Sequence, residues 1–283
     1  MDGSTNRGTG PSEVRKLRVR YPAVCSVCRC EITRGTQAWW HRAAKKITCL
    51  VCGSGAELAH DLAGTAGASG RKKFERLHEQ REQRVKNRFG KRVGGLVLAL
   101  SDDPQSTRAW RTGSAGEERL ARFFDRELPA SAVGLHDRRI PHSRANIDHI
   151  VVAPGGVWVI DTKLYEGKVE RRTIGPIWRP EFALFVGGRN RMKLIRAMPR
   201  QVDAVRAAIA ADPLADDLAV TAAICFVDSN WGLFPKPFEV ADVLVAWPQK
   251  LVGRIGVSGR LTSTAVARIA NRIAVGLPAA ARS

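Results

Sequence analysis

Two acidic residues and a lysine lie close together in a short apolar stretch near the middle of the chain. Residues 146–163 hold two β-branched segments joined by a Pro-Gly dipeptide, a pattern typical of a β-hairpin. If the turn is centred on that dipeptide, Asp148 lies opposite Asp161. The two-residue period of a strand also places Lys163 on the face of Asp161. The same register pairs Val152 with Val157 and Ile150 with Val159.

These opposed carboxylates need a counterion, because like charges facing each other across strands destabilise a sheet. Mg²⁺ prefers one or two carboxylates together with water and phosphate oxygens, so the hairpin end is a candidate site for a divalent cation. Two simpler interpretations remain: the charges are solvated at an exposed end, or Lys163 only forms a salt bridge with Asp161. Both faces of the hairpin are apolar, which favours burial. We expect His149, on the opposite face beside Val151 and Ile147, to be structural.

A second group of chemically active residues lies near the N-terminus. Four cysteines form two Cys-x-x-Cys pairs with twenty residues between them: Cys25, Cys28, Cys49 and Cys52. This spacing lets four thiolates surround zinc as a tetrahedron, and a redox pair of thiols is the alternative. Cys30 and His41 lie between the pairs as spare candidates, and Cys225 lies in an apolar run where we expect an inert core residue.

The composition restricts the partners and the environment. The chain has 283 residues, with 46 Lys and Arg against 27 Asp and Glu, which leaves a formal charge of +19. Such an excess favours a polyanionic partner such as nucleic acid. No apolar run approaches the roughly 18 residues of a membrane span, and the start lacks a secretory signal. We therefore expect a cytoplasmic protein without a membrane contact, in which reduced cysteines bind metal.

The composition along the chain predicts four segments. Residues 1–20 are polar and basic and are predicted to form a flexible arm, and residues 21–56 form the zinc ribbon. Residues 57–93 comprise a Gly/Ala-rich linker over 64–70 and then a basic helix over 71–92. That helix either follows nucleic acid phosphates or is a plain solvated connection. Residues 94–283 form the main domain.

The elements of the main domain follow from periodicity and turn residues. Residues 94–110 are predicted to form an edge element, and Ser114 and Glu117 form a capping box at the start of a helix. The rest follows in this order: strands over 133–141, 146–153 and 156–163, a strand pair reaching Gly187, a helix with Pro199 in its first turn, strands over 218–228 and 240–247, and a helix capped by Thr262 or Ser263. Capping alone would explain Glu117.

Several of these motifs resemble, in the right order, the nuclease-related domain (NERD) family over about residues 112–210. They are Gly-x-Ala-Gly-Glu117 before a helix, Ile-Pro141, Asn146-Ile-Asp148-His149, the strand from Gly156 to Lys163, and Gln201. That family in turn resembles the PD-(D/E)xK restriction-endonuclease-like superfamily. The resemblance implies an α/β fold with a restriction-endonuclease-like core, a mixed sheet flanked by helices. To this core the chain adds the small N-terminal zinc-ribbon module and the basic helical linker.

The resemblance also implies an activity and a site. It makes Glu117, Asp148, Asp161, Lys163 and Gln201 the catalytic residues, the first three binding magnesium or manganese. The implied reaction is metal-dependent hydrolysis of phosphodiester bonds in DNA, or in RNA, for DNA processing or repair. The zinc ribbon and the basic helix would hold the backbone phosphates without reading sequence.

Two other classes of function fit the same sequence. The chain could be a non-catalytic nucleic-acid-binding or scaffold protein that keeps a nuclease-like fold, because fold does not guarantee activity. It could also be an adaptor whose zinc ribbon binds a protein partner, which predicts no DNA affinity at physiological salt.

Overall fold

The computed structural model describes residues 14–26, 31–42, 44–49, 64–77, 79–80, 83, 87, 105–143, 145–176, 178 and 180–280. It divides the chain into two compact units, Met1–Asp61 and Leu62–Ser283. No helix of the described residues has the length and apolar character needed to cross a bilayer.

The first unit is a small β structure. Strands β1 (Val14–Arg18), β4 (Gln37–His41) and β5 (Lys46–Cys49) form an antiparallel sheet in the order β1-β4-β5. Strands β2 (Ala23–Val24) and β3 (Glu31–Ile32) pair separately. Among its buried residues are Ala38, Cys25 and Cys49.

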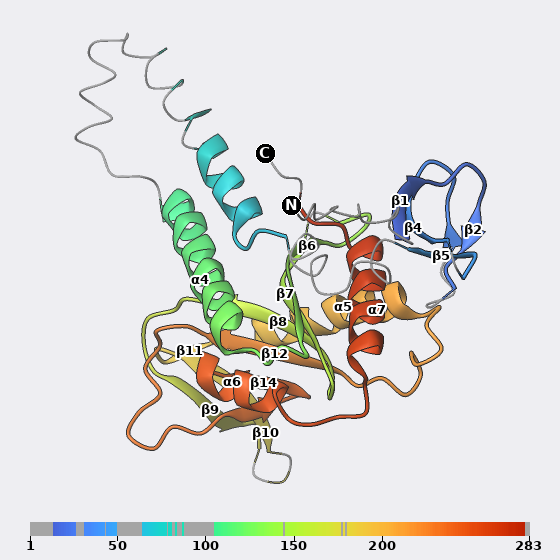
Figure 1. Cartoon of the computed structure of the whole chain (residues 1–283). Helices are drawn as coiled ribbons and strands as arrows, with labels where there is room; N and C mark the ends of the chain where they lie inside the picture. Colours follow the sequence, from blue (N-terminus) through green and yellow to red (C-terminus); the bar gives the residue numbers. More distant parts are fainter. Residues whose placement is uncertain are drawn as a thin grey trace, which may run out of the picture. The chain divides into compact units, whose positions relative to one another are not determined.

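A six-stranded mixed sheet forms the centre of the second unit, in the order β13-β14-β12-β8-β7-β6 (Figure 1). The strands are β6 (Val133–Arg139), β7 (Asn146–Ala153), β8 (Gly156–Lys163), β12 (Val220–Phe226), β13 (Phe238–Val240) and β14 (Val243–Ala246). Strands β6, β7 and β8 are antiparallel neighbours, whereas β8, β12 and β14 run parallel. The predicted mixed α/β fold is therefore confirmed.

Helices cover both faces of this sheet. Helices α4 (Gln105–Glu127) and α6 (Pro248–Ile255) bury Leu120, Phe124 and Leu251 against one face. Helices α5 (Met192–Ile209) and α7 (Ser263–Gly276) pack on the other. A separate antiparallel sheet of β9 (Val169–Ile174), β10 (Glu181–Val186) and β11 (Arg189–Asn190) adds Val169, Leu184 and Val186 to that second core.

The hairpin of β7 and β8 has the predicted register. Val152 pairs with Val157, and Ile150 pairs with Val159. Gly156, at a φ of 137°, makes the turn possible, because a Cβ there would lie 2.6 Å from the carbonyl oxygen of Ala219.

Two helix starts differ from the prediction. Helix α4 already begins at Gln105, so residues 105–110 are helical rather than an edge element, and Ser114 is buried inside the helix instead of capping it. Helix α5 begins at Met192, where the Asn190 side chain accepts the Met192 N–H at 2.9 Å, and Pro199 lies inside it. Local cap signals misled because tertiary packing extends both helices beyond them.

Residues 64–70 are a packed segment, although their composition suggested a linker. Ala66 is buried, and Gly67 has a φ of 71° with its Cα against Ser114, whose carbonyl oxygen would lie 2.8 Å from a Cβ. A helix follows over residues 68–77, which includes the start of the predicted basic helix. Most of the remaining basic stretch lies outside the described residues, as do residues 94–104.

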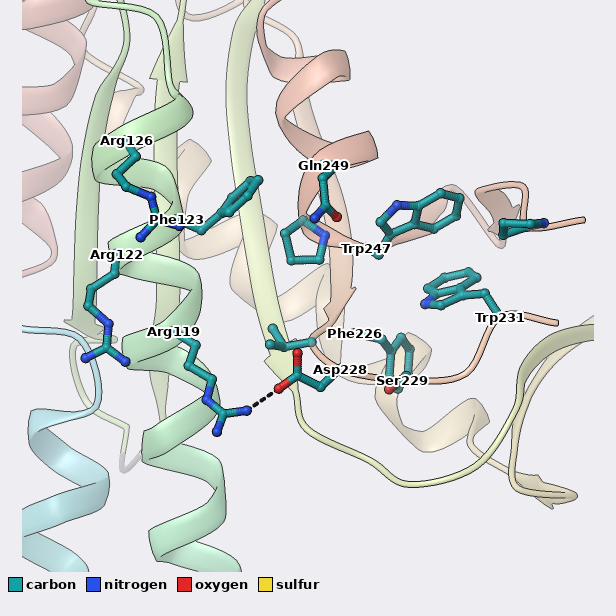
Figure 2. A pocket seen from close by; sticks show the side chains of 13 residues that line it. Arg119, Arg122, Phe123, Arg126, Phe226, Asp228, Ser229, Trp231, Trp247 and Gln249 are labelled. Carbon is teal, nitrogen blue, oxygen red and sulfur yellow. Dashed lines mark hydrogen bonds and ion pairs between the residues drawn. The ribbon is translucent and has the colours of Figure 1, made fainter. Parts of the chain in front are cut away.

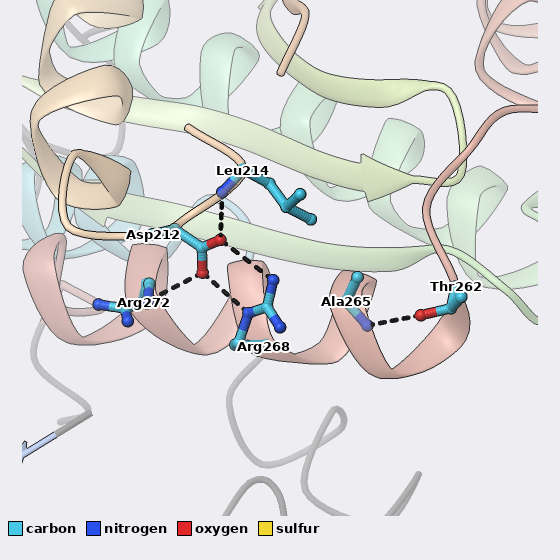
Figure 3. A network of polar contacts seen from close by, with 6 residues as sticks. All are labelled: Asp212, Leu214, Thr262, Ala265, Arg268 and Arg272. Carbon is cyan, nitrogen blue, oxygen red and sulfur yellow. Dashed lines mark hydrogen bonds and ion pairs between the residues drawn. The ribbon is translucent and has the colours of Figure 1, made fainter. Parts of the chain in front are cut away.

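The C-terminal part is held by one buried carboxylate and one predicted cap. The Thr262 hydroxyl accepts the Ala265 N–H at 3.2 Å, which confirms the cap of α7. Asp212 accepts hydrogen bonds from Arg268, Arg272 and the Leu214 N–H, all between 2.9 and 3.1 Å (Figure 3). Burial alone would raise the pKa of Asp212, but these donors hold it below its usual value.

Replacing Asp212 tests this carboxylate. Asp212→Ala removes an acceptor that two largely buried guanidinium groups and one backbone N–H share, so we expect the free energy of unfolding to fall by about 3 to 5 kcal/mol. Urea unfolding at neutral pH measures the change. The matched control is Asp217→Ala in the same loop, where the carboxylate is exposed and the expected change is within about 0.5 kcal/mol. Equal losses in the two variants would contradict the account.

Candidate active site

Three aspartates lie side by side on the neighbouring strands β6, β7 and β8, at the end of the β7–β8 hairpin away from its turn. This row of Asp137, Asp148 and Asp161 is called the aspartate edge below. On β6 and β7, the pairs His136–His149 and Arg138–Ile147 leave Asp137 directly opposite Asp148. On β7 and β8, the pairing of His149 with Ile160 leaves Asp148 opposite Asp161. The predicted opposition of Asp148 and Asp161 therefore has a third carboxylate beside it.

The strands are irregular where these aspartates lie. Asp137 has a φ of 48°, in the left-handed region that only a few residue types adopt readily. Ile147 and Ile150 belong to the same buried cluster, although residues three apart in a regular strand point to opposite faces. The expected position of Ile147 beside His149 is therefore wrong. A local interruption of regular strand pairing changes the direction of nearby side chains, here those of Asp148 and its neighbours.

The Asp148 side chain, rather than a backbone carbonyl group, accepts a hydrogen bond from the neighbouring strand β8. Its Oδ2 accepts the Thr162 N–H at 2.8 Å, from the strand that carries Asp161. Burial and the charge of Asp161 raise the pKa of Asp148 to about 7, against the opposing effects of Lys163 and the Thr162 N–H. At neutral pH a second positive charge would therefore be needed to keep this carboxylate fully ionised.

Lys163 is the counterion of Asp161. Its Nζ lies 2.6 Å from Asp161 Oδ2 and donates to the Thr162 carbonyl oxygen at 3.0 Å. The two side chains are only 20% and 14% exposed. Burial lowers the pKa of Lys163, but the charges of Asp161 and Asp148 raise it more, so the net shift is upward. Lys163 is a cation at this edge at every physiological pH.

Glu117 reaches the same group of charges from α4. Burial, Asp148 and Asp137 raise the pKa of Glu117 to about 9, while Lys163 and a hydrogen bond from the Gly67 backbone lower it. A pKa in this range means that Glu117 carries a proton at neutral pH in the absence of a further cation. The prediction that its side chain faces inward agrees with this burial, whereas its role as a capping residue does not hold, since it lies inside α4.

Asp137, which was not predicted from the sequence, forms hydrogen bonds with other residues of the chain. Its carboxylate accepts the Ser69 N–H at 2.7 Å, the Ser69 hydroxyl at 2.8 Å and the Asn146 amide at 2.7 Å. It thereby fixes the start of the helix over residues 68–77 to β6. No local pattern marks this residue, because its role depends on strand pairing and on a distant serine.

Gln201 and His149 have environments of their own. Gln201 lies half-buried on α5, and its side-chain oxygen is buried without a hydrogen-bond partner in the described part of the chain. His149 is fully buried, with its Nδ1 2.7 Å from Nδ1 of His136 and its ring edge-on to Phe124. Burial lowers the pKa of both histidines, to about 4 for His136. The pair is therefore neutral and packs between the sheet and α4.

The predicted metal ligands fall in both units of the chain. Among the described residues, no three His, Cys, Asp or Glu side chains lie close enough together to form a ready metal site. In the first unit, Cys25 and Cys49 are buried, and the Cys49 N–H donates to Cys25 Sγ at 3.3 Å. Cys28, Cys30 and Cys52 lie outside the described residues. His41 Nε2 lies 3.0 Å from the Thr48 hydroxyl.

Cys225 has none of the features of a reactive thiol. It is fully buried on β12, and burial raises the pKa of its thiol. A thiol that stays protonated is a poor nucleophile and a poor metal ligand. The environment agrees with the predicted inert core residue.

The comparison with known proteins identifies the region that contains this edge. The model of the nuclease-related domain matches residues 112–227, which include most of α4, the three aspartates, Lys163 and α5. Searches of curated proteins and of solved structures found no match to the chain. Residues 112–227 of this chain are therefore a nuclease-related domain of the NERD family.

Proposed function

We propose that this protein is a metal-dependent nuclease that hydrolyses phosphodiester bonds of DNA, with its centre at the edge formed by Asp148, Asp161 and Lys163. The single observation that supports this most is the register that sets the two aspartates opposite each other, with Lys163 on Asp161, inside a nuclease-related domain. A merely structural hairpin end has no use for opposed carboxylates, because they destabilise it.

The donor set fits magnesium or manganese. Asp148 and Asp161 offer hard carboxylate oxygens, and Glu117 is positioned electrostatically to complete the set directly or through water. The raised pKa of Asp148 is the expected signature of carboxylates that lack a shared cation, since a nearby cation favours the ionised form. Lys163 contacts Asp161 through Oδ2, and the ion is proposed to bind the Oδ1 side of this carboxylate.

Each residue then has a defined task. A bound Mg²⁺ or Mn²⁺ supplies Lewis acidity and a more acidic water. Asp148 and Asp161 hold opposite sides of the site, and the Thr162 N–H keeps the Asp148 carboxylate oriented. Lys163, beside Asp161, would orient the attacking water and offset the negative charge that develops on the phosphate. Gln201, on the following helix, is proposed as a polar contact at the same centre.

The remaining charge serves binding. The net charge of +19 favours a polyanion, and the N-terminal zinc ribbon with the basic helix is proposed to hold backbone phosphates. Four cysteines, Cys25, Cys28, Cys49 and Cys52, would bind one zinc ion. The contact of the Cys49 N–H with Cys25 Sγ supports this, because it brings one cysteine of each pair together. The ribbon is also the candidate site for a protein partner.

Loss of cleavage on substitution tests the catalytic assignment. We expect Asp161→Asn and Lys163→Met each to reduce Mg²⁺-dependent nicking of plasmid and of single-stranded circular DNA by roughly 100-fold, because each removes one charge from the centre. Lys193→Met on α5, which removes an exposed lysine, is the matched control and keeps wild-type activity. Circular dichroism checks the fold of each variant. Nicking that survives both substitutions contradicts the assignment, and DNA binding without cleavage in the wild type favours the non-catalytic scaffold.

The pH dependence of stability tests the crowded carboxylates. Asp148 and Glu117 have folded pKa values of about 7 and about 9, well above those of an unfolded chain. In EDTA the folded protein therefore retains protons that the unfolded chain releases, so these two groups make the unfolding free energy fall as the pH rises from about 4 to about 9. Asp148→Asn is expected to remove the contribution of Asp148 to this pH dependence of the unfolding free energy.

The same experiment measures metal binding without activity. We compare urea unfolding of the wild type, Asp148→Asn and the exposed control Asp217→Asn at pH 5 and pH 8; comparison at each pH cancels the opposite contribution of the buried histidines. Mn²⁺ at pH 8 is expected to stabilise the wild type and Asp217→Asn more than Asp148→Asn. Equal stabilisation of all three proteins by Mn²⁺ would place the ion elsewhere.

Zinc content tests the ribbon. We expect the purified protein to contain one zinc ion per chain by inductively coupled plasma mass spectrometry. Cys25→Ser or Cys49→Ser should lose the zinc, because each removes a thiolate ligand. Cys225→Ala is the matched control, since this thiol is buried in the other unit. A full zinc content in Cys25→Ser would refute the four-cysteine site.

A further inference from the structure

A pocket of about 560 Å³ lies between α4 and the loops that follow β12 and β14 (Figure 2). One wall is formed by α4, which contributes Arg119, Arg122 and Arg126 together with Phe123. The other holds the rings of Trp231 and Trp247, with Phe226 at the end of β12. A volume of this size is that of a small-molecule or nucleotide site.

The pocket adjoins the candidate active site through the backbone. Phe226, which lines it, pairs with Lys163 across β12 and β8. The next residue, Val227, donates its N–H to the Lys163 carbonyl oxygen at 2.9 Å. Neighbouring strands lie about 4.8 Å apart, so the pocket begins one strand away from the lysine of the active site. A ligand chain that crosses the aspartate edge can therefore continue into the pocket.

Only part of the charge on the arginine wall is neutralised by ion pairs within the described residues. Arg119 forms an ion pair with Asp228, which the dashed line in Figure 2 marks. Arg122 and Arg126 are exposed and have no carboxylate partner in the described part of the chain. They lie four residues apart on one helix, where like charges repel each other. An anion between them relieves that repulsion, and a guanidinium binds a phosphate through two hydrogen bonds.

The opposite wall is aromatic and rigid. The ring centroids of Trp231 and Trp247 lie 4.9 Å apart at 56°, so the rings do not stack on each other. Phe226 at 6.4 Å and Phe238 at 6.1 Å support Trp231 from the protein side. Both tryptophans are half-buried and line the pocket. Indole faces held in this way are stacking platforms for nucleobases.

Together the two walls select a class of ligand. A free phosphate would not stack on the tryptophans, and an apolar ligand would not form ion pairs with the arginines. A base inside a duplex cannot reach an aromatic wall, because it is stacked on its neighbours and paired. The combination of phosphate-binding arginines and stacking rings fits a nucleotide whose base is unpaired.

We propose that this pocket binds an unpaired nucleotide of the strand whose phosphate lies at the aspartate edge, so that the substrate is single-stranded or has a single-stranded end. The base stacks on Trp247 and Trp231, and Arg122 and Arg126 bind its phosphate. This inference rests on the proposed function for the position of the cleaved bond, whereas binding in the pocket is independent of catalysis.

Binding without cleavage tests the pocket. Fluorescence anisotropy in EDTA compares a labelled single-stranded oligonucleotide with a blunt duplex of the same sequence. We expect Trp247→Leu to weaken single-strand binding by about tenfold and to leave duplex binding unchanged, because only an unpaired base stacks there. We expect Arg122→Gln combined with Arg126→Gln to weaken single-strand binding and to reduce its salt dependence.

The control is Arg206→Gln on α5, which removes an exposed arginine far along the chain from this wall. A loss of binding as large in the control as in the double variant would mean that the arginines contribute only general positive charge, which overturns the pocket. Single-strand binding unaffected by Trp247→Leu, with melting curves showing intact protein, overturns it as well. So does competition by an acidic, aromatic peptide as strong as that by the strand. A deoxynucleoside monophosphate that competes as well as the strand would assign the pocket to free nucleotides instead, which contradicts the proposal.

The two proposals fail in different ways. If the wild type binds single strands through Trp247 but cleaves no DNA with Mg²⁺ or Mn²⁺, the nuclease assignment fails and the pocket stands. If it cleaves DNA and the pocket variants bind and cleave like the wild type, the pocket fails and the nuclease assignment stands.

Discussion

Carboxylates crowd one edge of the central sheet, and their mutual repulsion constrains everything around them. Asp137, Asp148 and Asp161 lie side by side on three neighbouring strands, and Glu117 adds a fourth carboxyl group from α4. The protein compensates in three ways: Lys163 pairs with Asp161, backbone and side-chain donors bind Asp137 and Asp148, and Glu117 retains a proton. Keeping these carboxyl groups together lowers the stability of the fold, and a cation bound there during function would explain why the chain has them.

The same constraint explains the local irregularities of the fold. The left-handed backbone at Asp137 and the broken alternation at Asp148 turn these side chains away from the two apolar cores. The donors from Ser69 then bind Asp137 and hold residues 64–70 against β6. Strain and buried charge concentrated at one place are typical of functional sites. The neutral pair of His136 and His149, one residue away, keeps the opposite face closed.

The parts predicted from sequence are those that depend on local pattern. The Pro-Gly turn and the alternating apolar residues determined the register that sets Asp148 opposite Asp161, and Thr262 marked the cap of α7. The starts of α4 and α5 were wrong, because Ser114 and Pro199 look like helix starts but are held inside longer helices by packing. Asp137 and the arginine and tryptophan pocket had no sequence signal, since their neighbours come from distant segments.

The most direct test is anomalous diffraction from a crystal soaked with Mn²⁺. We predict a peak between Asp148 and Asp161 at metal–oxygen distances of about 2.0 to 2.3 Å. A well-ordered crystal without manganese density at this edge would contradict this prediction. The charges would then form a closed salt bridge, and the nuclease fold would serve binding alone.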